Sequence, residues 1–308
     1  MSENKYDLMI LGSGPAGLTA ALFGQRLGLQ VIVFGDIPGG STYMIHHLAN
    51  FPGFMEEISG TQFGTMTFQQ AQSEGAFFTM TRLKRLSHEE DAFVGVDDDG
   101  HQHVASCAIV ATGRVPLRLA VANAKVSGVH FCSICDGPLY RGKNAILAVV
   151  GNDNTAGQHA VTLARVADKV LLISHRDSLA MDAAHKKMIE KHKNIELLLN
   201  TEVTAYKGTG TINGVKLLSE DGKDRELPID GIFLAIGWRP NTKMLDFQVV
   251  KTSDGYLKAD QHLMTSFPGL FTAGDVRETD MWQVLTACAD GARAAKYAAE
   301  FIEKIQIF

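Results

Sequence analysis

The sequence of 308 residues is short of cysteine and lacks long runs of a single residue class. Its four cysteines are too few for the disulfide framework of a small secreted domain. A formal net charge of −5 without a long basic run argues against a nucleic-acid partner. No apolar run suggests a signal peptide or a transmembrane span. These absences predict a cytoplasmic protein without a membrane partner.

One local motif carries redox chemistry. Cys132 and Cys135 are separated by two residues and followed by Asp136. A loop this short closes at little entropic cost, a thiolate within it is easily stabilised, and the adjacent carboxyl group can exchange a proton with the outgoing sulfur. The pair therefore predicts a redox-active disulfide.

Zinc binding is the rival interpretation of this motif. Structural zinc needs four ligands, usually from two such pairs, and only His130 lies nearby. Cys107 lies in an apolar strand pattern and Cys288 in a helix of small residues, so both are expected to pack in the core. No metal site is predicted.

A glycine-rich turn near the start has the spacing of a nucleotide-binding motif. Gly12, Gly14 and Gly17 follow an apolar strand and open a helix. The first glycine suits a tight turn, the second permits close approach of a pyrophosphate, and the third lets helix and strand pack. No acid ends the second strand, where Gly35 stands with Asp36 just beyond, so ribose recognition is less well defined than phosphate recognition. A plain structural turn is the alternative.

Periodicity and turn residues indicate two similar units, one inserted in the other. Strands are predicted over residues 5–11, 30–34, 76–86, 92–97, 101–105, 145–150, 169–174, 195–207 and 213–218, and helices over residues 61–75, 178–193 and 282–308. Two further helices follow the glycine turns and end near residues 28 and 167. The predicted fold is α/β, with two Rossmann-like dinucleotide-binding domains of the three-layer ββα type. One comprises residues 1–116 and 241–308, and residues 117–240 form the inserted domain.

The order of motifs resembles that of the low-molecular-weight thioredoxin reductases, which are homodimeric FAD flavoproteins. The resemblance covers nearly the whole chain and rests on residues 12–17, 39–40, 50–53, 111–113, 132–137 and 273–275. It implies that FAD binds to the outer domain and that the inserted domain carries the disulfide. By position, Cys135 should lie nearest the flavin, Cys132 should attack a thioredoxin-like partner, and Asp136 matches the acid of the family.

The resemblance also implies a set of cofactor-binding positions in the outer domain. They are Gly12, Gly14, Pro15, Ala16, Gly17, Gly35, Asp36, Gly39, Gly40, Ser41, Asn50, Ala111, Thr112, Gly113, Gly274, Asp275, Trp282, Gln283 and Val284. Two of them depart from the family pattern, because Ser41 replaces a glutamine and Trp282 an arginine. Trp282 is expected to pack at an interface, to stack on a second flavin, or to shield the first.

The NADPH site of the family is degraded in this sequence. Asp153 stands where the second glycine of the second turn is expected. At ~4 Å and an effective dielectric of ~20, its carboxylate would repel a pyrophosphate by about 4 kcal/mol, although it can equally cap the following helix. Of the basic cluster that reads the 2′-phosphate only Arg176 remains, because Ser174, His175 and Ala180 replace a histidine and two arginines.

These changes resemble the branches of the family that do not use pyridine nucleotides, namely ferredoxin-dependent flavin thioredoxin reductases and diflavin-linked disulfide oxidoreductases. The favoured function is electron transfer from FAD through Cys132 and Cys135 to a thioredoxin-like protein. Ferredoxin or another flavin, including a second FAD in place of NADPH, is the candidate donor. A conventional NAD(P)H-dependent thioredoxin reductase and a flavin-based redox sensor remain alternatives. The linkers at residues 113–116 and 237–240 are predicted to act as swivels.

Overall fold

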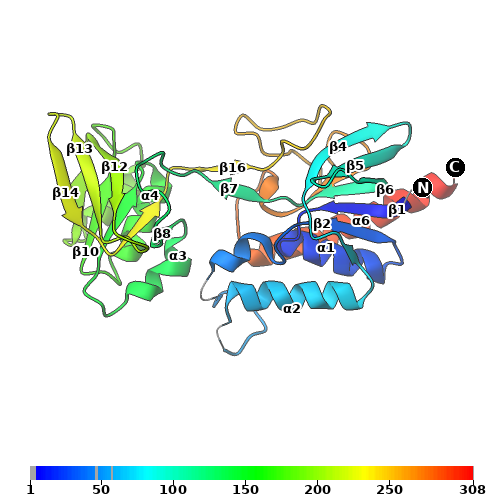
Figure 1. The fold of residues 1–308 in the computed structure, drawn as a ribbon, viewed down its shortest axis with the longest axis horizontal. Coiled ribbons are helices and arrows are strands. Elements are labelled where there is room, and N and C mark those ends of the chain that lie inside the picture. The colour runs from blue at the N-terminus through cyan, green and yellow to red at the C-terminus, as the bar shows by residue number, and fades with distance from the viewer. Residues whose placement is uncertain (1–4, 46–47, 57, 308) are drawn as a thin grey trace. The chain divides into compact units, whose positions relative to one another are not determined.

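The chain forms two compact α/β units (Figure 1), in a computed structural model that describes residues 5–45, 48–56 and 58–307. Unit 1 comprises the chain up to Val115 and from Arg239 onward, and unit 2 comprises Pro116–Trp238. Each unit is built around its own sheet with a parallel core, as the two glycine turns predict. Among the described residues, no helix is long and apolar enough to cross a membrane.

Unit 1 is centred on a sheet in the order β3-β2-β1-β6-β5-β4, with β17 beside β6. The parallel strands are β1 (Lys5–Leu11), β2 (Val31–Phe34), β3 (Phe77–Phe78), β6 (Gln102–Val110) and β17 (Leu270–Thr272). β4 (Leu83–Glu89) and β5 (Ala92–Asp97) join antiparallel at one edge. Both faces of the central strands are covered, which explains why β2 is apolar and buried at every position.

Helices α1 (Pro15–Arg26), α2 (Gly60–Ser73) and α6 (Val284–Ile307) belong to unit 1. Alanines of α1 and α6 share one core cluster with β1, so small side chains allow close packing. A capping box formed by Ser59 and Gln62 begins α2. Two short 3₁₀ helices, η1 (Gly40–Met44) and η3 (Gly274–Val276), lie in the loops that follow β2 and β17.

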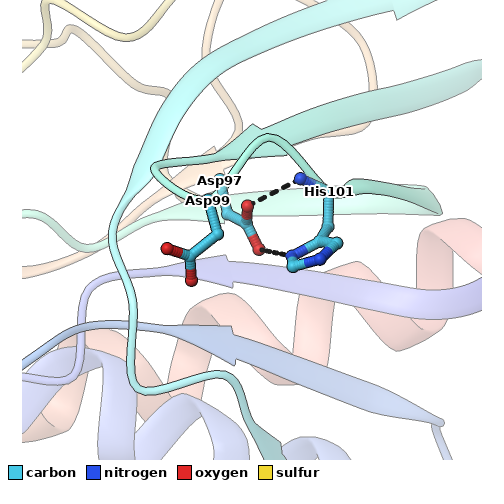
Figure 2. A group of neighbouring side chains, drawn as sticks. All are labelled: Asp97, Asp99 and His101. Carbon is cyan, nitrogen blue, oxygen red and sulfur yellow. Dashed lines mark hydrogen bonds and ion pairs between the residues drawn. The ribbon is translucent and has the colours of Figure 1, made fainter.

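The hairpin turn between β5 and β6 gathers acidic and imidazole side chains (Figure 2). Buried Asp97 accepts a hydrogen bond from the His101 backbone N–H at 2.8 Å, and its other oxygen lies 3.4 Å from His101 Nδ1 and 3.2 Å from His103 Nε2. Asp99 and His101 are exposed. Protein groups thus satisfy the buried carboxylate and stabilise the turn.

Unit 2 has a five-stranded parallel sheet in the order β11-β10-β9-β15-β8. Its strands are β8 (Val129–His130), β9 (Ile146–Val150), β10 (Lys169–Ile173), β11 (Ile195–Leu198) and β15 (Gly231–Leu234). An antiparallel sheet consists of β12 (Thr201–Lys207), β13 (Gly214–Ser219) and β14 (Asp224–Pro228). The helices are α3 (Ser133–Asp136), η2 (Gly137–Tyr140), α4 (Asn154–Leu163) and α5 (Ala183–Glu190).

Several predicted elements differ from the structure. The predicted strand at 76–86 is two strands, because Met80 between them has a positive φ of 55°. The strand predicted over 195–207 is likewise broken at Asn200, whose φ is 49°. The helix predicted over 178–193 spans only Ala183–Glu190, since Asp182 caps its start. The strand expected at 101–105 continues to Val110, and the predicted end of the last helix at residue 308 lies outside the described residues.

The connections between the units are short strands. β7 (Arg114–Pro116) and β16 (Trp238–Pro240) pair as a two-stranded sheet. They include most of both predicted swivels, whose movement stays a prediction.

Candidate functional site

The two cysteines of the redox motif are joined in a disulfide in unit 2. Cys132 caps the start of α3, where its sulfur accepts a hydrogen bond from the Cys135 backbone N–H at 3.2 Å. Both cysteines are half-buried, whereas Ile134 between them is 58% exposed. The motif therefore combines a sheltered disulfide with an apolar side chain at the surface.

Asp136 is buried at the end of α3 and contacts an imidazole. Its Oδ2 lies 3.2 Å from His130 Nδ1, and His130 Nε2 lies 2.7 Å from the hydroxyl of Tyr140. The second carboxylate oxygen, Oδ1, is buried and has no hydrogen-bond partner within the described part of the chain. An unsatisfied buried oxygen beside a redox disulfide is a group that could take or give a proton.

Asp136 was predicted from the sequence, but its contacts with His130 and Tyr140 were not. His130 was considered only as a zinc ligand, and Tyr140 was not singled out. The available signal was the presence of a basic and a phenolic side chain within a few residues of Asp136. Burial raises the pKa of Tyr140 to about 12, helped by the negative charges of Asp136 and Asp230, so this phenol stays protonated at neutral pH.

In unit 1, the first glycine turn lies between β1 and α1. A Cβ on Gly12 would be 2.3 Å from the carbonyl oxygen of Ala111, and one on Gly17 would be 1.8 Å from that of Gly12. A Cβ on Gly14 would instead have only the Gly39 oxygen within 4 Å. Gly14 is also the N-cap of α1 and provides no side-chain cap, with Pro15 next to it. The N-terminus of α1 thus has space and unsatisfied N–H groups, which fit a cofactor phosphate.

Other predicted cofactor residues surround this turn. The Gly39 N–H donates to the Ser13 oxygen at 2.8 Å, and Gly35 packs against the Ser13 side chain. Gly40 and exposed Ser41 begin η1. Asp36 is exposed and forms a 2.7 Å ion pair with Arg82, whose hydrogen bond lowers the pKa of that carboxyl group. A ribose hydroxyl would therefore have to share Asp36 with Arg82.

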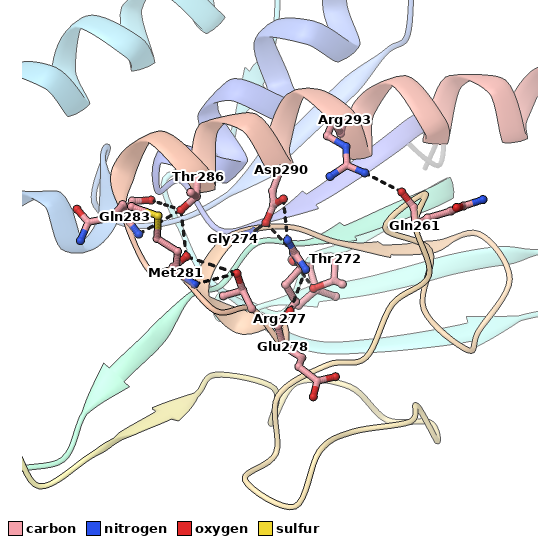
Figure 3. Close-up of polar contacts among 12 residues, drawn as sticks. Gln261, Thr272, Gly274, Arg277, Glu278, Met281, Gln283, Thr286, Asp290 and Arg293 are labelled. Carbon is pink, nitrogen blue, oxygen red and sulfur yellow. Dashed lines mark hydrogen bonds and ion pairs between the residues drawn. The ribbon is translucent and has the colours of Figure 1, made fainter. Parts of the chain in front are cut away.

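The second turn expected to contact the cofactor, residues 273–275, is fixed by a partly buried ion pair (Figure 3). Asp290 of α6 accepts hydrogen bonds from the Gly274 N–H at 3.1 Å and from Arg277 Nε and Nη2 at 2.6 and 3.0 Å. Gly274 lies against Ala16 of α1, so both turns meet at one place in unit 1. Asp290 and Arg277, which hold the backbone of the turn at Gly274, were not predicted from the sequence.

Arg114 and Trp282 lie beside Asp275. Asp275 Oδ2 is 3.3 Å from Arg114 Nε, and burial raises the pKa of this carboxyl group although Arg114 opposes the shift. The Arg114 guanidinium lies over the Trp282 ring, 4.5 Å from its centroid, and the Tyr256 ring is 6.1 Å away. Trp282 is therefore held within unit 1 by a cation–π contact.

The remaining predicted positions lie on loops and element ends of the same unit. The Asn50 side chain donates to the Gln283 side chain at 2.9 Å, and Val284 begins α6. Ala111 directly follows β6, and the Thr112 hydroxyl donates to the Asn241 oxygen at 2.5 Å. The Asn241 N–H in turn donates to the Gly113 oxygen at 3.0 Å. Residues distant in sequence are thus connected around the end of β6.

The corresponding turn of unit 2 carries a capping carboxylate. Gly151 makes the same tight turn as Gly12, since its Cβ would be 2.4 Å from the Ala235 oxygen. Asp153 caps α4, and its side chain accepts a hydrogen bond from the Ala156 N–H at 3.0 Å. The helix terminus that would face a phosphate therefore already carries a carboxylate.

The segment that follows β10, residues 174–180, carries little positive charge. Ser174 is buried, and its hydroxyl accepts a hydrogen bond from the Arg176 N–H at 3.1 Å. His175 and Arg176 are exposed. Ser174 is thus committed to the local turn, and Arg176 alone retains a permanent positive charge between residues 174 and 180.

Two parallel-sheet units of the dinucleotide-binding type and a Cys-x-x-Cys disulfide define the class, a flavoprotein disulfide oxidoreductase. The sequence matches the family described as pyridine nucleotide-disulphide oxidoreductase over residues 6–291. The chain belongs to this family, and its curated relatives identify it as thioredoxin-reductase-like. Membership of this group implies FAD, and the glycine turn of unit 1 fits that cofactor.

Individual relatives match over nearly the whole chain. The thioredoxin reductase of Treponema pallidum is 33% identical, with 99% of each chain covered. That of Listeria monocytogenes is 32% identical over 99% of this chain and 97% of the relative. The solved thioredoxin reductase of Streptococcus pyogenes is 28% identical, with a TM-score of 0.84 over 98% of this chain and 100% of that one.

Proposed function

We propose that this protein passes electrons from FAD bound to unit 1, through the Cys132–Cys135 disulfide of unit 2, to a thioredoxin-like protein, and that its donor is not NADPH. The observation that carries the proposal is the contrast between the two glycine turns. Gly14 leaves the N-terminus of α1 open, whereas Asp153 caps that of α4 with a negative charge. One unit is suited to a dinucleotide phosphate and the other is not.

FAD would be held by both turns of unit 1. The N-terminus of α1 would face the pyrophosphate, and the turn at Gly274 and Asp275 would supply further polar groups. Asp290 and Arg277 would keep that turn in place. When bound, the flavin supplies two-electron redox chemistry. The other predicted positions, including Asn50 and Gln283, would line the cofactor.

The cysteines would divide the exchange reaction between them. In the reduced form, Cys132 would attack the target disulfide, forming a mixed disulfide and releasing one target sulfur as a thiolate that takes up a proton. Cys135 would then attack the Cys132 sulfur, closing the disulfide again and releasing the second target thiolate. Asp136 would accept the Cys135 proton and give it to the second target thiolate as it leaves. Two electrons and two protons would thus pass from the pair to the target.

The donor proposal rests on two deficits at opposite ends of the NADPH site. Asp153 would repel the pyrophosphate by about 4 kcal/mol at ~4 Å and an effective dielectric of ~20. Each missing charge-assisted bond to the 2′-phosphate would cost a further ~1.5–3 kcal/mol. Reduced ferredoxin or another flavin is the donor class that we propose instead. A homodimer is the proposed assembly, as in the family that the sequence resembles.

Electron transfer to the thioredoxin-like acceptor is tested by a single turnover in the absence of any electron donor. The purified flavoprotein is reduced photochemically under anaerobic conditions and mixed with oxidised thioredoxin, and new thioredoxin thiols are counted by alkylation and mass spectrometry. We expect two new thioredoxin thiols for every two electrons introduced, which is four per chain when both the flavin and the Cys132–Cys135 pair are reduced. Wild-type protein that reduces no thioredoxin and keeps its own dithiol would contradict the proposal and favour a redox sensor.

A further inference from the structure

His130 occupies a position from which it controls the acid beside the disulfide. We propose that His130, held in place by Tyr140, is a positioning residue that sets the protonation of Asp136 during exchange at Cys132 and Cys135. The inference rests on the proposed function, since it concerns the same dithiol. It goes further by assigning a role to two residues outside the redox motif.

The contacts of His130 fix both ring nitrogens. Nε2 lies 2.7 Å from the Tyr140 hydroxyl and Nδ1 lies 3.2 Å from Asp136 Oδ2. Because the phenol stays protonated, it can donate to Nε2, which leaves the imidazole proton on Nδ1, facing the carboxylate. The ring also stacks on Phe233, with centroids 4.8 Å apart and planes at 25°. The orientation of the His130 ring is therefore determined by a partner at each nitrogen and by the stacked ring of Phe233.

The fold positions these residues from four neighbouring elements. His130 ends β8 and pairs with Phe233 of β15, while Asp136 ends α3 and Tyr140 ends η2. Gly231 allows the approach, because a Cβ there would be 2.3 Å from the Tyr140 hydroxyl. Any larger residue at 231 would displace the phenol from the imidazole.

The charged groups around the cluster are few. Asp136 faces His130 from α3, and Tyr140 faces it from η2. Asp230, directly before β15, acts on Tyr140 through its charge, but its Oδ2 accepts a hydrogen bond from the Ile146 N–H at 2.8 Å. Among the described residues, no lysine or arginine forms an ion pair with Asp136 that could replace His130.

The unsatisfied oxygen of Asp136 gives this arrangement its chemical consequence. Oδ2 faces the imidazole, whereas Oδ1 is buried and unpartnered among the groups that the structure describes. Because an unpaired buried acceptor is unfavourable, a transient hydrogen-bond partner is expected for Oδ1. The thiol of neighbouring Cys135 is that partner: its proton moves to Asp136 as its sulfur attacks Cys132, and Asp136 then gives the proton to the departing target thiolate. The Nδ1–H of His130 donates to Asp136 Oδ2 and holds the carboxyl group in place for both transfers.

The test compares variants of the reduced flavoprotein in single turnover with oxidised thioredoxin between pH 5.5 and 9. In His130→Gln, which cannot titrate, we expect the rate at neutral pH to fall about 10-fold and its pH profile to shift. Tyr140→Phe should change the profile in the same direction by a smaller amount. Adding His130→Gln to Asp136→Asn should cause no further loss, because the imidazole acts through the carboxylate.

Matched controls separate this role from a structural one. Tyr206→Phe removes a hydroxyl from the other tyrosine of unit 2 whose pKa burial raises to about 12, and His175→Gln removes an exposed imidazole from the same unit. Neither should move the profile. Unchanged profiles in both His130→Gln and Tyr140→Phe would overturn the inference. If His130→Gln does not fold, an unchanged profile in Tyr140→Phe overturns it alone.

A second readout keeps this inference distinguishable from the proposed function. The rate at which iodoacetamide alkylates Cys132 and Cys135 in the reduced protein is measured across the same pH range, with no acceptor present. If wild-type protein does not reduce thioredoxin, the proposed function fails, yet a shifted alkylation profile in His130→Gln still supports the role of His130. If wild-type protein turns over and neither profile shifts, only the inference about His130 fails.

Discussion

The carboxylate of Asp153 accepts a hydrogen bond from the backbone N–H of Ala156 at 3.0 Å, at the start of the helix that would face a second dinucleotide. Gly14 stands at the corresponding place in unit 1 and leaves its helix uncapped by any side chain. The two units thus share a βα turn but differ in what their helix N-termini can bind. This difference leads to a reciprocal pair of predictions.

Asp153→Gly should restore part of a nucleotide site in unit 2. Removing the carboxylate frees the Ala156 N–H and removes the like charge, so we expect NADPH to bind at least 10-fold more tightly by equilibrium dialysis, within the limit of ~4 kcal/mol for that repulsion. Asp182→Gly is the matched control, because Asp182 caps α5 by accepting from the His185 N–H at 2.8 Å. Equal NADPH affinity in both variants and wild type would show that the carboxylate does not exclude the nucleotide.

Gly14→Asp should have the opposite effect in unit 1. There is room for a side chain at residue 14, because only the Gly39 oxygen is within 4 Å of a Cβ there. We therefore expect the variant to fold but to lose FAD. Gly14→Ala should weaken FAD binding less, because it adds bulk without charge. The measurement is FAD released per chain by acid precipitation, which in wild type should be complete and non-covalent. Full FAD content in Gly14→Asp would place the cofactor elsewhere.

Cys135→Ser should trap a mixed disulfide with thioredoxin better than Cys132→Ser. The attacking thiol is retained in the first variant, while the thiol that would resolve the adduct is absent. Intact-mass spectrometry after mixing each reduced variant with oxidised thioredoxin measures the adduct. Preferential trapping by Cys132→Ser would mean that the roles of the two cysteines are reversed.

Burial of His159 on α4 predicts a pH-dependent stability of unit 2. Desolvation lowers the pKa of His159 to about 4, from 6.5, with the Asp153 charge opposing the shift. The unfolded chain therefore binds an extra proton between these values, so the stabilisation is present above pH 6.5 and is lost as the pH falls toward 4.

The loss between pH 7 and 5 should be about 2 kcal/mol, measured by urea unfolding. His159→Gln should remove this part of the pH dependence, whereas His175→Gln, with an exposed imidazole, should retain it. The same slope in His159→Gln and wild type would exclude His159 as its source.

The position of Trp282 predicts one FAD per chain. Arg114 already lies over the ring at 4.5 Å from its centroid, so a second flavin would have only the opposite face for stacking. We expect gentle purification to give a ratio of one that excess FAD does not raise. A ratio of two that returns to one in Trp282→Ala would instead identify the indole as the platform for a second flavin.

Local pattern in the sequence predicted much of the fold. The turn at Gly12 and the buried runs of β1 and β2 are dictated by backbone geometry and apolar periodicity, so they were recoverable from residues alone. The breaks at Met80 and Asn200 were not, because each depends on a single residue adopting a positive φ within an otherwise strand-like run. The helix-capping role weighed for Asp153 is confirmed by its contact with Ala156.

Side-chain contacts between different helices and strands could not be predicted from the sequence. Arg277 and Asp290 meet because η3 and α6 are adjacent in space, and no spacing rule joins them. The contact of Arg114 with Trp282 likewise joins residues from separate halves of unit 1. His130 was noted in the sequence, but its contact with Tyr140 could not be predicted. That contact depends on β8 and η2 both packing against β15.

The choice of electron donor tests the account most directly. The oxidised flavoprotein is mixed anaerobically, in separate stopped-flow experiments, with NADPH, NADH and reduced ferredoxin, and bleaching of the flavin absorbance is followed. We expect no prompt bleaching by either pyridine nucleotide and prompt bleaching by reduced ferredoxin. Prompt bleaching by NADPH at low concentration would contradict it and identify a conventional thioredoxin reductase in which Asp153 is tolerated.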